Sequence, residues 1–319
     1  NQPKLSMCKN FLISYNGEIY NLNILKKNLI DSNIFIKNWN SDTELLVNYI
    51  SVFGIEKTLA DIEGMFAFVV FDLRNKIIYA ARDKFGEKPL YFYSYNNSFI
   101  FSSDLIAIKK LIPDLDLDLN SLDMFLKMGY ILAPRSIYKK VKKIQPGNYV
   151  RIDSFNNKKV SKSFFKYYDI GKNINKFNNS EKKSNKTQLK ETLFKSVESQ
   201  LVSDVEIGTF LSGGIDSSLI TSIASKINPR IETFTIGFEE KNFDESNYAK
   251  KISEFLNLKN FCFTVKSKDL LKVVDNLSDI YTEPFADSSQ IPTSILSNFA
   301  SKRVKVALTG DGGDEMFLG

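Results

Sequence analysis

Two short loops combine glycines with hydroxyl and carboxylate side chains, which are the residue types that bind phosphates and divalent metals. The first, Ser212-Gly213-Gly214-Ile215-Asp216-Ser217-Ser218, directly follows an apolar run that ends at Leu211. Glycines let the backbone approach a ligand closely, and the start of the following helix offers unpaired N–H groups to an anion. Asp216 suits such a loop if Mg²⁺ joins its carboxylate to a phosphate. The alternative is a glycine turn before a serine-capped helix. We favour a phosphate-binding loop.

The second loop, Thr309-Gly310-Asp311-Gly312-Gly313-Asp314-Glu315, follows the apolar run 304–308. An isolated acidic turn is usually solvated surface. Here the preceding run is a strand candidate of the same parallel sheet as 205–211, and ligands of such sheets bind at the carboxyl ends of the strands. We therefore predict that both loops emerge at one edge of the sheet. Asp216 and Asp314 would then share one Mg²⁺ over bound phosphates.

A third segment, Ser14-Tyr15-Asn16-Gly17-Glu18-Ile19-Tyr20-Asn21, follows the predicted strand 11–15. An amide hydrolase needs an oxyanion hole, which the side-chain amide of Asn16 and the backbone N–H of Gly17 can supply. It also needs anions to hold the α-ammonium group of its substrate, for which Glu18 and Asp42 are candidates. Taken alone, Asn-Gly-Glu is an ordinary turn.

Composition excludes several kinds of chemistry. The 319 residues include no histidine, which removes Ser-His-Asp triads and histidine metal centres. Cys8 and Cys262 are too few for a disulfide framework or a zinc site of the usual spacing. The net charge is +6, but only six of the 43 basic residues are arginines, and the lysines crowd with asparagine. We therefore expect no nucleic-acid surface. The sequence contains no apolar run long enough for a membrane span, so we expect no membrane partner.

The order of elements predicts two domains of different architecture. In residues 1–152, short strands joined by tight turns alternate with helices at 24–30 and 42–53, which indicates an α+β domain with antiparallel sheets. Residues 153–186 are polar and read as a linker or loop. In residues 187–319, strand candidates alternate with helices at 217–226, 248–256, 270–281 and 292–300, which is typical of an α/β domain with a parallel sheet.

The three motifs together resemble a known family. The first loop is similar to the pyrophosphate-binding loop of ATP pyrophosphatases, a class that also contains GMP synthetases, NAD synthetases and tRNA-thiolating enzymes. The second resembles the S-G-E/D-G-x-D-E segment of asparagine synthetases, with Thr309 in place of the usual serine. The Asn16-Gly17-Glu18 segment resembles class II glutamine amidotransferase domains. The combination resembles glutamine-hydrolysing asparagine synthetases over essentially the whole chain.

The resemblance implies a glutaminase-like domain followed by an ATP-pyrophosphatase-like domain, and ATP-dependent amidation of aspartate through an aspartyl-adenylate. Asn16 and Gly17 would form the oxyanion hole, and Glu18 and Asp42 would bind glutamine. Asp311 would support adenylate formation. ATP and Mg²⁺ are the implied cofactors, with Asp216 and Asp314 as metal ligands. The residues implied in ATP binding are Leu211, Ser212, Gly213, Gly214, Asp216, Ser217, Ser218, Ile236, Thr309 and Gly310.

Several expectations stay open at this point. The family's cysteine nucleophile would lie upstream of Asn1 and the rest of its synthetase domain after Gly319, so we expect an inactive fragment. The resemblance implies glutamine, aspartate and ATP as small-molecule partners and a cytoplasmic enzyme, and it allows a homodimer. The alternatives are an acceptor other than aspartate, such as a sugar acid or a cyclising substrate, and a remnant that binds glutamine or nucleotide without turnover. Residues 283–292 fit a structural role and a substrate contact about equally.

Overall fold

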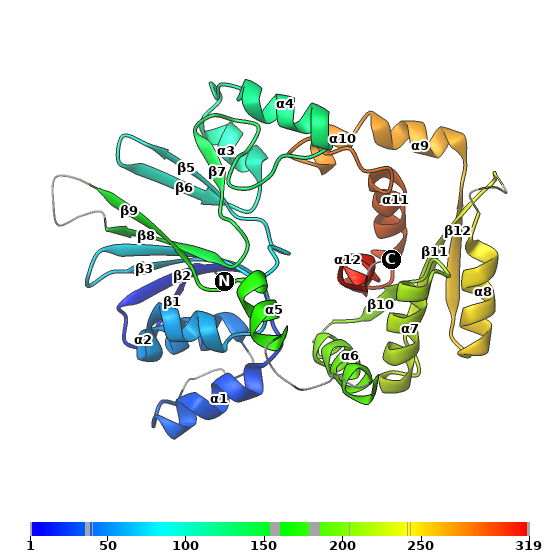
Figure 1. The fold of residues 1–319 in the computed structure, drawn as a ribbon, viewed down its shortest axis with the longest axis horizontal. Coiled ribbons are helices and arrows are strands. Elements are labelled where there is room, and N and C mark those ends of the chain that lie inside the picture. Colours follow the sequence, from blue (N-terminus) through cyan, green and yellow to red (C-terminus); the bar gives the residue numbers. More distant parts are fainter. Residues whose placement is uncertain are drawn as a thin grey trace. The chain divides into compact units, whose positions relative to one another are not determined.

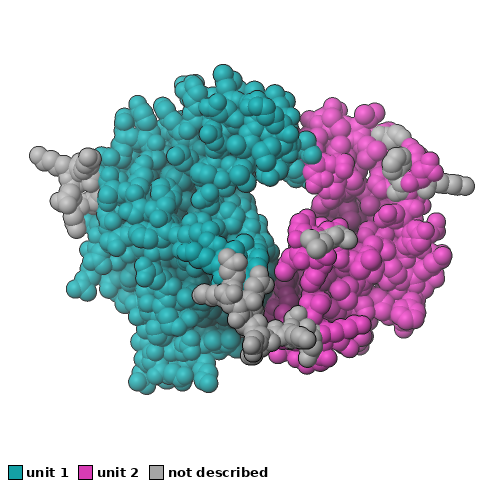
Figure 2. All heavy atoms as spheres, viewed as in Figure 1, with its two compact units in different colours: residues 1–182, 281–286 teal, residues 183–280, 287–319 magenta. Residues whose placement is uncertain are grey.

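The computed structural model describes residues 2–35, 39, 41–153, 160–178, 186–203, 205–240, 242 and 244–317. The chain forms two compact units, drawn as a ribbon in Figure 1 and coloured separately in Figure 2. Unit 1 comprises Asn1–Lys182 and Tyr281–Ala286, and unit 2 comprises Lys183–Ile280 and Asp287–Gly319. No helix in the described ranges is long and apolar enough to cross a membrane.

Unit 1 contains two antiparallel sheets. The larger has the order β1-β2-β3-β4-β8-β9, with these strands at Lys4–Leu5, Phe11–Ile19, Gly64–Asp72, Ile77–Arg82, Asn148–Asp153 and Ser161–Lys166. The smaller has the order β6-β5-β7, at Ser98–Ser102, Tyr91–Tyr95 and Val141–Lys143. Short turns join β3 to β4 and β5 to β6, as the sequence predicts for hairpins.

Three apolar clusters hold these sheets and their helices together in layers. Helices α1 (Leu22–Asp31) and α2 (Asp42–Asp61) pack on one side of the larger sheet. A second cluster, including Phe92 and Val150, lies between the two sheets. A third joins the smaller sheet to α3 (Leu105–Leu111) and α4 (Leu119–Met128). Unit 1 is therefore a helix–sheet–sheet–helix arrangement, which confirms the α+β prediction.

Residues 161–178 differ from the predicted linker. Strand β9 pairs with β8, and the ring of Phe165 stacks on Tyr149 with centroids 4.9 Å apart. Helix α5 (Ile170–Asn178) follows. The lysines and asparagines of this segment made it resemble a loop. Strand β9 is an exposed edge strand, however, and charged side chains are common on such strands. Within the predicted linker 153–186, residues 154–159 and 179–185 lie outside the described residues.

Unit 2 is built on a parallel sheet of order β12-β11-β10-β13, at Asn260–Val265, Glu232–Phe238, Ile207–Phe210 and Val306–Leu308. One cluster packs α6 (Lys186–Gln200) and α7 (Ile215–Ile227) together, and another packs α11 (Gln290–Ala300) against Phe234 of β11. The predicted α/β architecture is therefore confirmed. The remaining helices are α8 (Ser246–Phe255), α9 (Ser267–Val274), α10 (Leu277–Ile280) and α12 (Gly313–Phe317).

The predicted helix 270–281 is wrong in its length, because α9 ends at Val274 and α10 begins at Leu277. The side-chain amide of Asn276 donates to the carbonyl of Lys272 at 3.0 Å. Asparagine competes in this way with the hydrogen bonds of a continuing helix.

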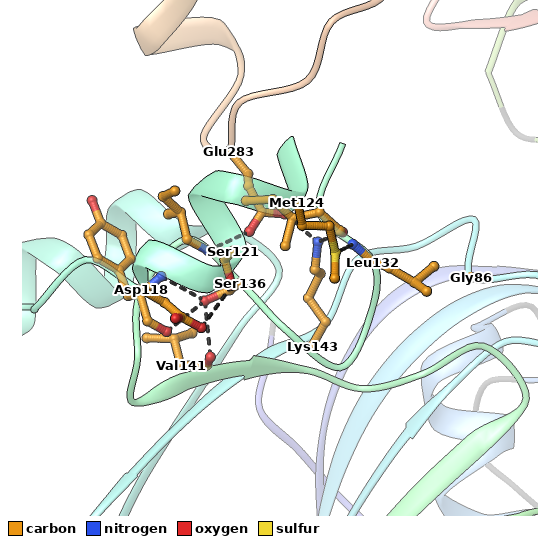
Figure 3. Close-up of polar contacts among 12 residues, drawn as sticks. Gly86, Asp118, Ser121, Met124, Leu132, Ser136, Val141, Lys143 and Glu283 are labelled. Atoms are coloured by element: carbon orange, nitrogen blue, oxygen red, sulfur yellow. Dashed lines mark hydrogen bonds and ion pairs between the residues drawn. The ribbon is translucent and has the colours of Figure 1, made fainter. Parts of the chain in front are cut away.

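A short segment from the second half of the sequence, Tyr281–Ala286, belongs to unit 1. The Glu283 carboxylate pairs with Lys143 and accepts the N–H of Ile137 at 2.9 Å (Figure 3). Both charged side chains are only 12% exposed. The N–H of Ala286 donates to the carbonyl of Gly129 at 2.6 Å. The segment is therefore attached to unit 1 by a nearly buried ion pair and by backbone hydrogen bonds.

We expect Lys143→Met to lower the free energy of unfolding of unit 1 by about 3 kcal/mol, because it leaves the Glu283 carboxylate buried without its cation. Adding Glu283→Leu should recover at least half of the loss. Trp39, the chain's one tryptophan, packs against the unit 1 core. Its fluorescence during urea denaturation measures the change.

The matched control is Lys127→Met, which removes a pair with Asp123 whose side chains are 71% and 60% exposed. That change should stay within about 0.5 kcal/mol. Equal losses for Lys143→Met and Lys127→Met would contradict the assigned role of the buried pair.

Candidate active sites

The first glycine loop begins where β10 ends and leads into α7. The carbonyl of Leu211 accepts a hydrogen bond from the Thr235 hydroxyl at 2.8 Å. The hydroxyl oxygens of Ser212 and Ser217 lie 2.9 Å apart. Helix α7 begins at Ile215 with Gly214 as its N-cap, two residues earlier than predicted. Glycine is an acceptable N-cap but gives a weaker signal than serine. Asp216 therefore lies in the first turn of the helix.

The second glycine loop lies against the first. A Cβ atom on Gly310 would come within 2.7 Å of the backbone nitrogen of Ser217, and one on Gly313 within 2.4 Å of the Asp216 carboxylate. At Gly310 the close neighbour is backbone, so only glycine fits there, whereas at Gly313 a larger residue would force the Asp216 side chain to turn away. The hydroxyl of Thr309 donates to the Asp311 carboxylate at 3.0 Å and holds it in place. The two loops thus meet at the carboxyl edge of the parallel sheet.

The loops line a cavity of about 510 Å³ within unit 2. It opens past the carboxyl ends of β10, β11 and β13, where parallel sheets bind their ligands. Its volume is in the usual range for a small-molecule site. The lining residues are Phe210, Leu211, Ser212, Gly214, Ile215, Asp216, Ser217, Ile236, Phe238, Glu245, Thr293, Leu296, Thr309, Gly310, Asp311, Gly312, Asp314 and Glu315.

Carboxylates dominate the charge of this cavity. Its lining includes Asp216, Glu245, Asp311, Asp314 and Glu315, and no lysine or arginine of the described chain is among the lining residues. Partial desolvation, followed by the nearby charge of Asp314 and a hydrogen bond to it, raises the pKa of the Asp216 carboxyl. Crowded like charges have this effect because they disfavour the ionised form. A polyanion could enter only with cations.

The paired acids fit a magnesium ion that is bound together with its ligand. Within the described residues, no group of three or more histidine, cysteine or acidic side chains is arranged to hold a metal by itself. Mg²⁺ in nucleotide sites typically takes one or two carboxylates and completes its shell with phosphate oxygens and water. Asp216 and Asp314 would supply the two carboxylates.

The predicted glutamine-binding residues lie on unit 1. Asn16, Gly17 and Glu18 are inside β2, whereas the sequence placed them after the strand. Gly17 pairs with Phe66 of β3, and a Cβ atom on Gly17 would come within 2.2 Å of the Met65 carbonyl oxygen. The prediction was wrong here because Asn-Gly is a common turn signal, while this glycine serves a close approach of two strands.

Asp42 is the first residue of α2, whose N-cap is Ser41. Its Oδ1 accepts the N–H of Thr43 at 2.6 Å. Burial raises the pKa of the Tyr15 hydroxyl, and the carboxylates of Asp42 and Glu18 both add to this effect. Both predicted glutamine ligands therefore act electrostatically on Tyr15, the residue that directly precedes Asn16 in the sequence.

Comparisons with known proteins match both units. The family model described as asparagine synthase matches residues 188–319, and the one described as a glutamine amidotransferase domain matches residues 1–168. The chain belongs to the glutamine-hydrolysing asparagine synthetase family. The second model alone covers more than half of the chain, and the two together cover nearly all of it.

Individual relatives agree with this assignment. The chain is 34% identical to putative asparagine synthetase [glutamine-hydrolyzing] 2 of Methanocaldococcus jannaschii, covering 97% of this chain and 58% of that protein. It is 31% identical to asparagine synthetase [glutamine-hydrolyzing] 1 of Bacillus subtilis, covering 100% and 49%. The chain thus spans about half the length of these curated relatives. A solved glutamine phosphoribosylpyrophosphate amidotransferase of B. subtilis aligns with 92% of this chain and 52% of its own at 14% identity, with a TM-score of 0.34, too low to add support.

Most of the nucleotide residues that the asparagine synthetase resemblance implied line the cavity of unit 2. Gly213 and Ser218 do not, and the Ser218 hydroxyl donates to the carbonyl of Gly214 at 2.5 Å. The sequence missed Phe210, Phe238, Glu245, Thr293 and Leu296, which also line the cavity. Thr293 directly follows Pro292, the last residue of the segment 283–292. This motif could therefore have indicated that the start of α11 reaches the cavity.

Three other residues that drew attention in the sequence have no place in these sites. Glu283, the first residue of the segment 283–292, takes part in the ion pair of Figure 3, where Lys143 reaches its carboxylate. Cys8 is exposed, and its sulfur lies 3.2 Å from the Ser6 hydroxyl. Cys262 is also exposed. The Glu283 half of this asparagine synthetase motif therefore has a structural role.

We expect Gly310→Ala to weaken binding of Mg–ATP to the full-length protein by about tenfold or more, because the new Cβ pushes the second loop away from Ser217. Overpacking of this kind also costs about 1–3 kcal/mol of stability. Isothermal titration with a non-hydrolysable ATP analogue and Mg²⁺ measures the first effect, and thermal denaturation measures the second. Gly171→Ala is the control, since the nearest atom to its Cβ would be 3.4 Å away. Wild-type affinity for Gly310→Ala would rule out loop contact as a requirement.

Proposed function

We propose that the full-length protein that contains this chain converts aspartate into asparagine with ATP and with ammonia taken from glutamine. Unit 2 would adenylate the aspartate side chain, and unit 1 would hydrolyse glutamine. The family assignment supports this reaction class. The observation that carries the adenylation step is the contact of two acidic glycine loops at the carboxyl edge of the parallel sheet.

The proposed chemistry proceeds in two steps at unit 2. A carboxylate oxygen of aspartate attacks the α-phosphorus of ATP, and pyrophosphate leaves. Ammonia then attacks the acyl carbon, and AMP leaves with the electron pair of the broken C–O bond. Negative charge builds on the departing pyrophosphate in the first step, and Mg²⁺ bound by Asp216 and Asp314 would stabilise it there.

The chain's own residues have separable parts in this proposal. The backbone of Ser212, Gly214 and Ser217, at the start of α7, would orient the phosphates. Ile236 and Thr309 would contact the nucleoside. Asp311, which Thr309 holds by a hydrogen bond, would support formation of the aspartyl-adenylate.

At unit 1, glutamine hydrolysis needs stabilisation of an oxyanion and recognition of the substrate's ammonium group. The side-chain amide of Asn16 and the backbone N–H of Gly17 would donate to the oxyanion, a contribution of about 2.7–4 kcal/mol for a single donor. Glu18 and Asp42 would hold the α-ammonium group. Their common neighbourhood around Tyr15 supports this pairing.

We expect Asp216→Asn to have opposite effects on stability and on ligand binding. Without Mg²⁺ it should raise the midpoint of thermal unfolding, because it removes the like charge beside Asp314. With saturating Mg–ATP it should lose most of the stabilisation that the wild type gains, which is about 2.7 kcal/mol at a ligand concentration of 100 Kd. Thermal scans with and without Mg–ATP measure both effects.

The matched control is Glu254→Gln, which alters an exposed acid that lies 3.9 Å from Lys250 and outside the cavity. It should keep the full stabilisation by Mg–ATP. If Asp216→Asn is stabilised by Mg–ATP as much as the wild type, the metal assignment is wrong.

We expect pyrophosphate release by the full-length protein to depend on aspartate and to continue when ammonium replaces glutamine. A coupled pyrophosphate assay with aspartate, a uronic acid or neither measures the acceptor. Turnover with the uronic acid but not with aspartate would favour the sugar-acid alternative. Nucleotide binding without release from either acceptor would favour a binding remnant.

A further inference from the structure

The hydroxyl of Tyr15 is buried and makes no hydrogen bond of normal geometry with the described residues. Tyr15 lies in β2, and only 8% of its surface is exposed. Buried side-chain polar atoms almost always have a partner, because losing water without replacement costs as much as a lost hydrogen bond. A hydroxyl left in this state therefore calls for a physical reason.

The surroundings of this hydroxyl are those of the proposed glutamine site. Tyr15 directly precedes Asn16. Burial raises the pKa of the Tyr15 hydroxyl, followed by the charge of the Asp42 carboxylate, a side-chain interaction with it and the charge of Glu18. The hydroxyl therefore remains protonated at neutral pH and can donate a hydrogen bond. The interaction with Asp42 does not reach the geometry of a hydrogen bond.

Asp42 is the natural acceptor for this proton. Among the described residues, its hydrogen bonds come from Thr43, whose N–H and hydroxyl both reach Oδ1, at 2.6 and 3.3 Å. These bonds tie one oxygen to the first turn of α2. A rotation of the carboxylate when a cationic group binds would bring an oxygen into line with the Tyr15 hydroxyl, on which Asp42 already acts.

We propose that Tyr15 is a positioning residue of the glutamine site, whose hydroxyl donates to the Asp42 carboxylate when that carboxylate holds the α-ammonium group of glutamine. This inference rests on the proposed function of unit 1. In this proposal, β2 contributes to the glutamine site twice. Asn16 and Gly17 stabilise the oxyanion, and Tyr15, on the core face of the strand, helps to recognise the substrate. A competing explanation is a buried water molecule that fills the hydroxyl's hydrogen-bonding capacity without any relation to substrate.

The test is Tyr15→Phe in the full-length protein. We expect the KM for glutamine to rise about tenfold or more, the factor expected for a hydrogen bond to a charged group. The rate of asparagine formation from saturating ammonium should not change, because ammonium bypasses unit 1. The midpoint of thermal unfolding should stay equal or rise, since phenylalanine removes an unsatisfied polar atom. A KM for glutamine equal to that of the wild type would overturn the proposal, and a lowered unfolding midpoint with that KM would identify the buried water instead.

Tyr49→Phe is the matched control, because Tyr49 belongs to the same core cluster. Its hydroxyl donates to Asp61 at 2.6 Å and accepts from Asn28 at 2.8 Å. Removing it should lower the unfolding midpoint and leave the KM for glutamine unchanged. An equal rise in KM for both variants would mean that any damage to this core affects the site, and would overturn a specific role for Tyr15. If the wild type does not hydrolyse glutamine, the proposed function of unit 1 fails and the inference fails with it.

Discussion

The close contact between the two glycine loops at the carboxyl edge of the parallel sheet determines how the acidic cavity of unit 2 is built. Strands β10 and β13 are neighbours, so the chain leaves both at the same edge. Gly310 and Gly313 then lie so near the first turn of α7 that a methyl group at either position would displace Ser217 or Asp216. The contact places acids from two distant parts of the sequence side by side. It also creates a repulsion that a bound cation can relieve.

The same contact explains how a site without a basic residue in its described lining can suit a nucleotide. Backbone N–H groups at a helix start and a carboxylate-bound metal can replace lysine and arginine in neutralising phosphates. The positive charge would then arrive with the ligand. Affinity would consequently depend on the concentration of the divalent ion as much as on that of the nucleotide.

Much of this arrangement could be predicted because it depends on local patterns. Apolar runs followed by glycine and acid identify strand ends, and alternation of strand and helix predicts a parallel sheet. The failures have different physical causes. Asn16 and Gly17 resemble a turn in the sequence, because the need for a glycine came from Met65 on the neighbouring strand, 48 residues after Gly17. The first turn of α7 was missed because its cap is a glycine.

Contacts between distant residues account for further features that the sequence did not reveal. Nothing near Glu283 in the sequence predicts its ion pair with Lys143. Nothing near Tyr15 shows that its hydroxyl has no hydrogen-bond partner among the described residues. The five cavity residues that the sequence missed share this property. None of them lies within the two glycine loops, and the fold brings them to the ends of the strands.

The discontinuity of unit 1 has a consequence for protein synthesis. Lys143 leaves the ribosome 140 residues before the acid that neutralises it. A nascent chain that has completed every other part of the first unit still holds this lysine without its partner. Unit 1 therefore cannot form this ion pair until much of unit 2 has been translated. A gene divided after codon 182 would yield a first product that lacks one of its own stabilising charges.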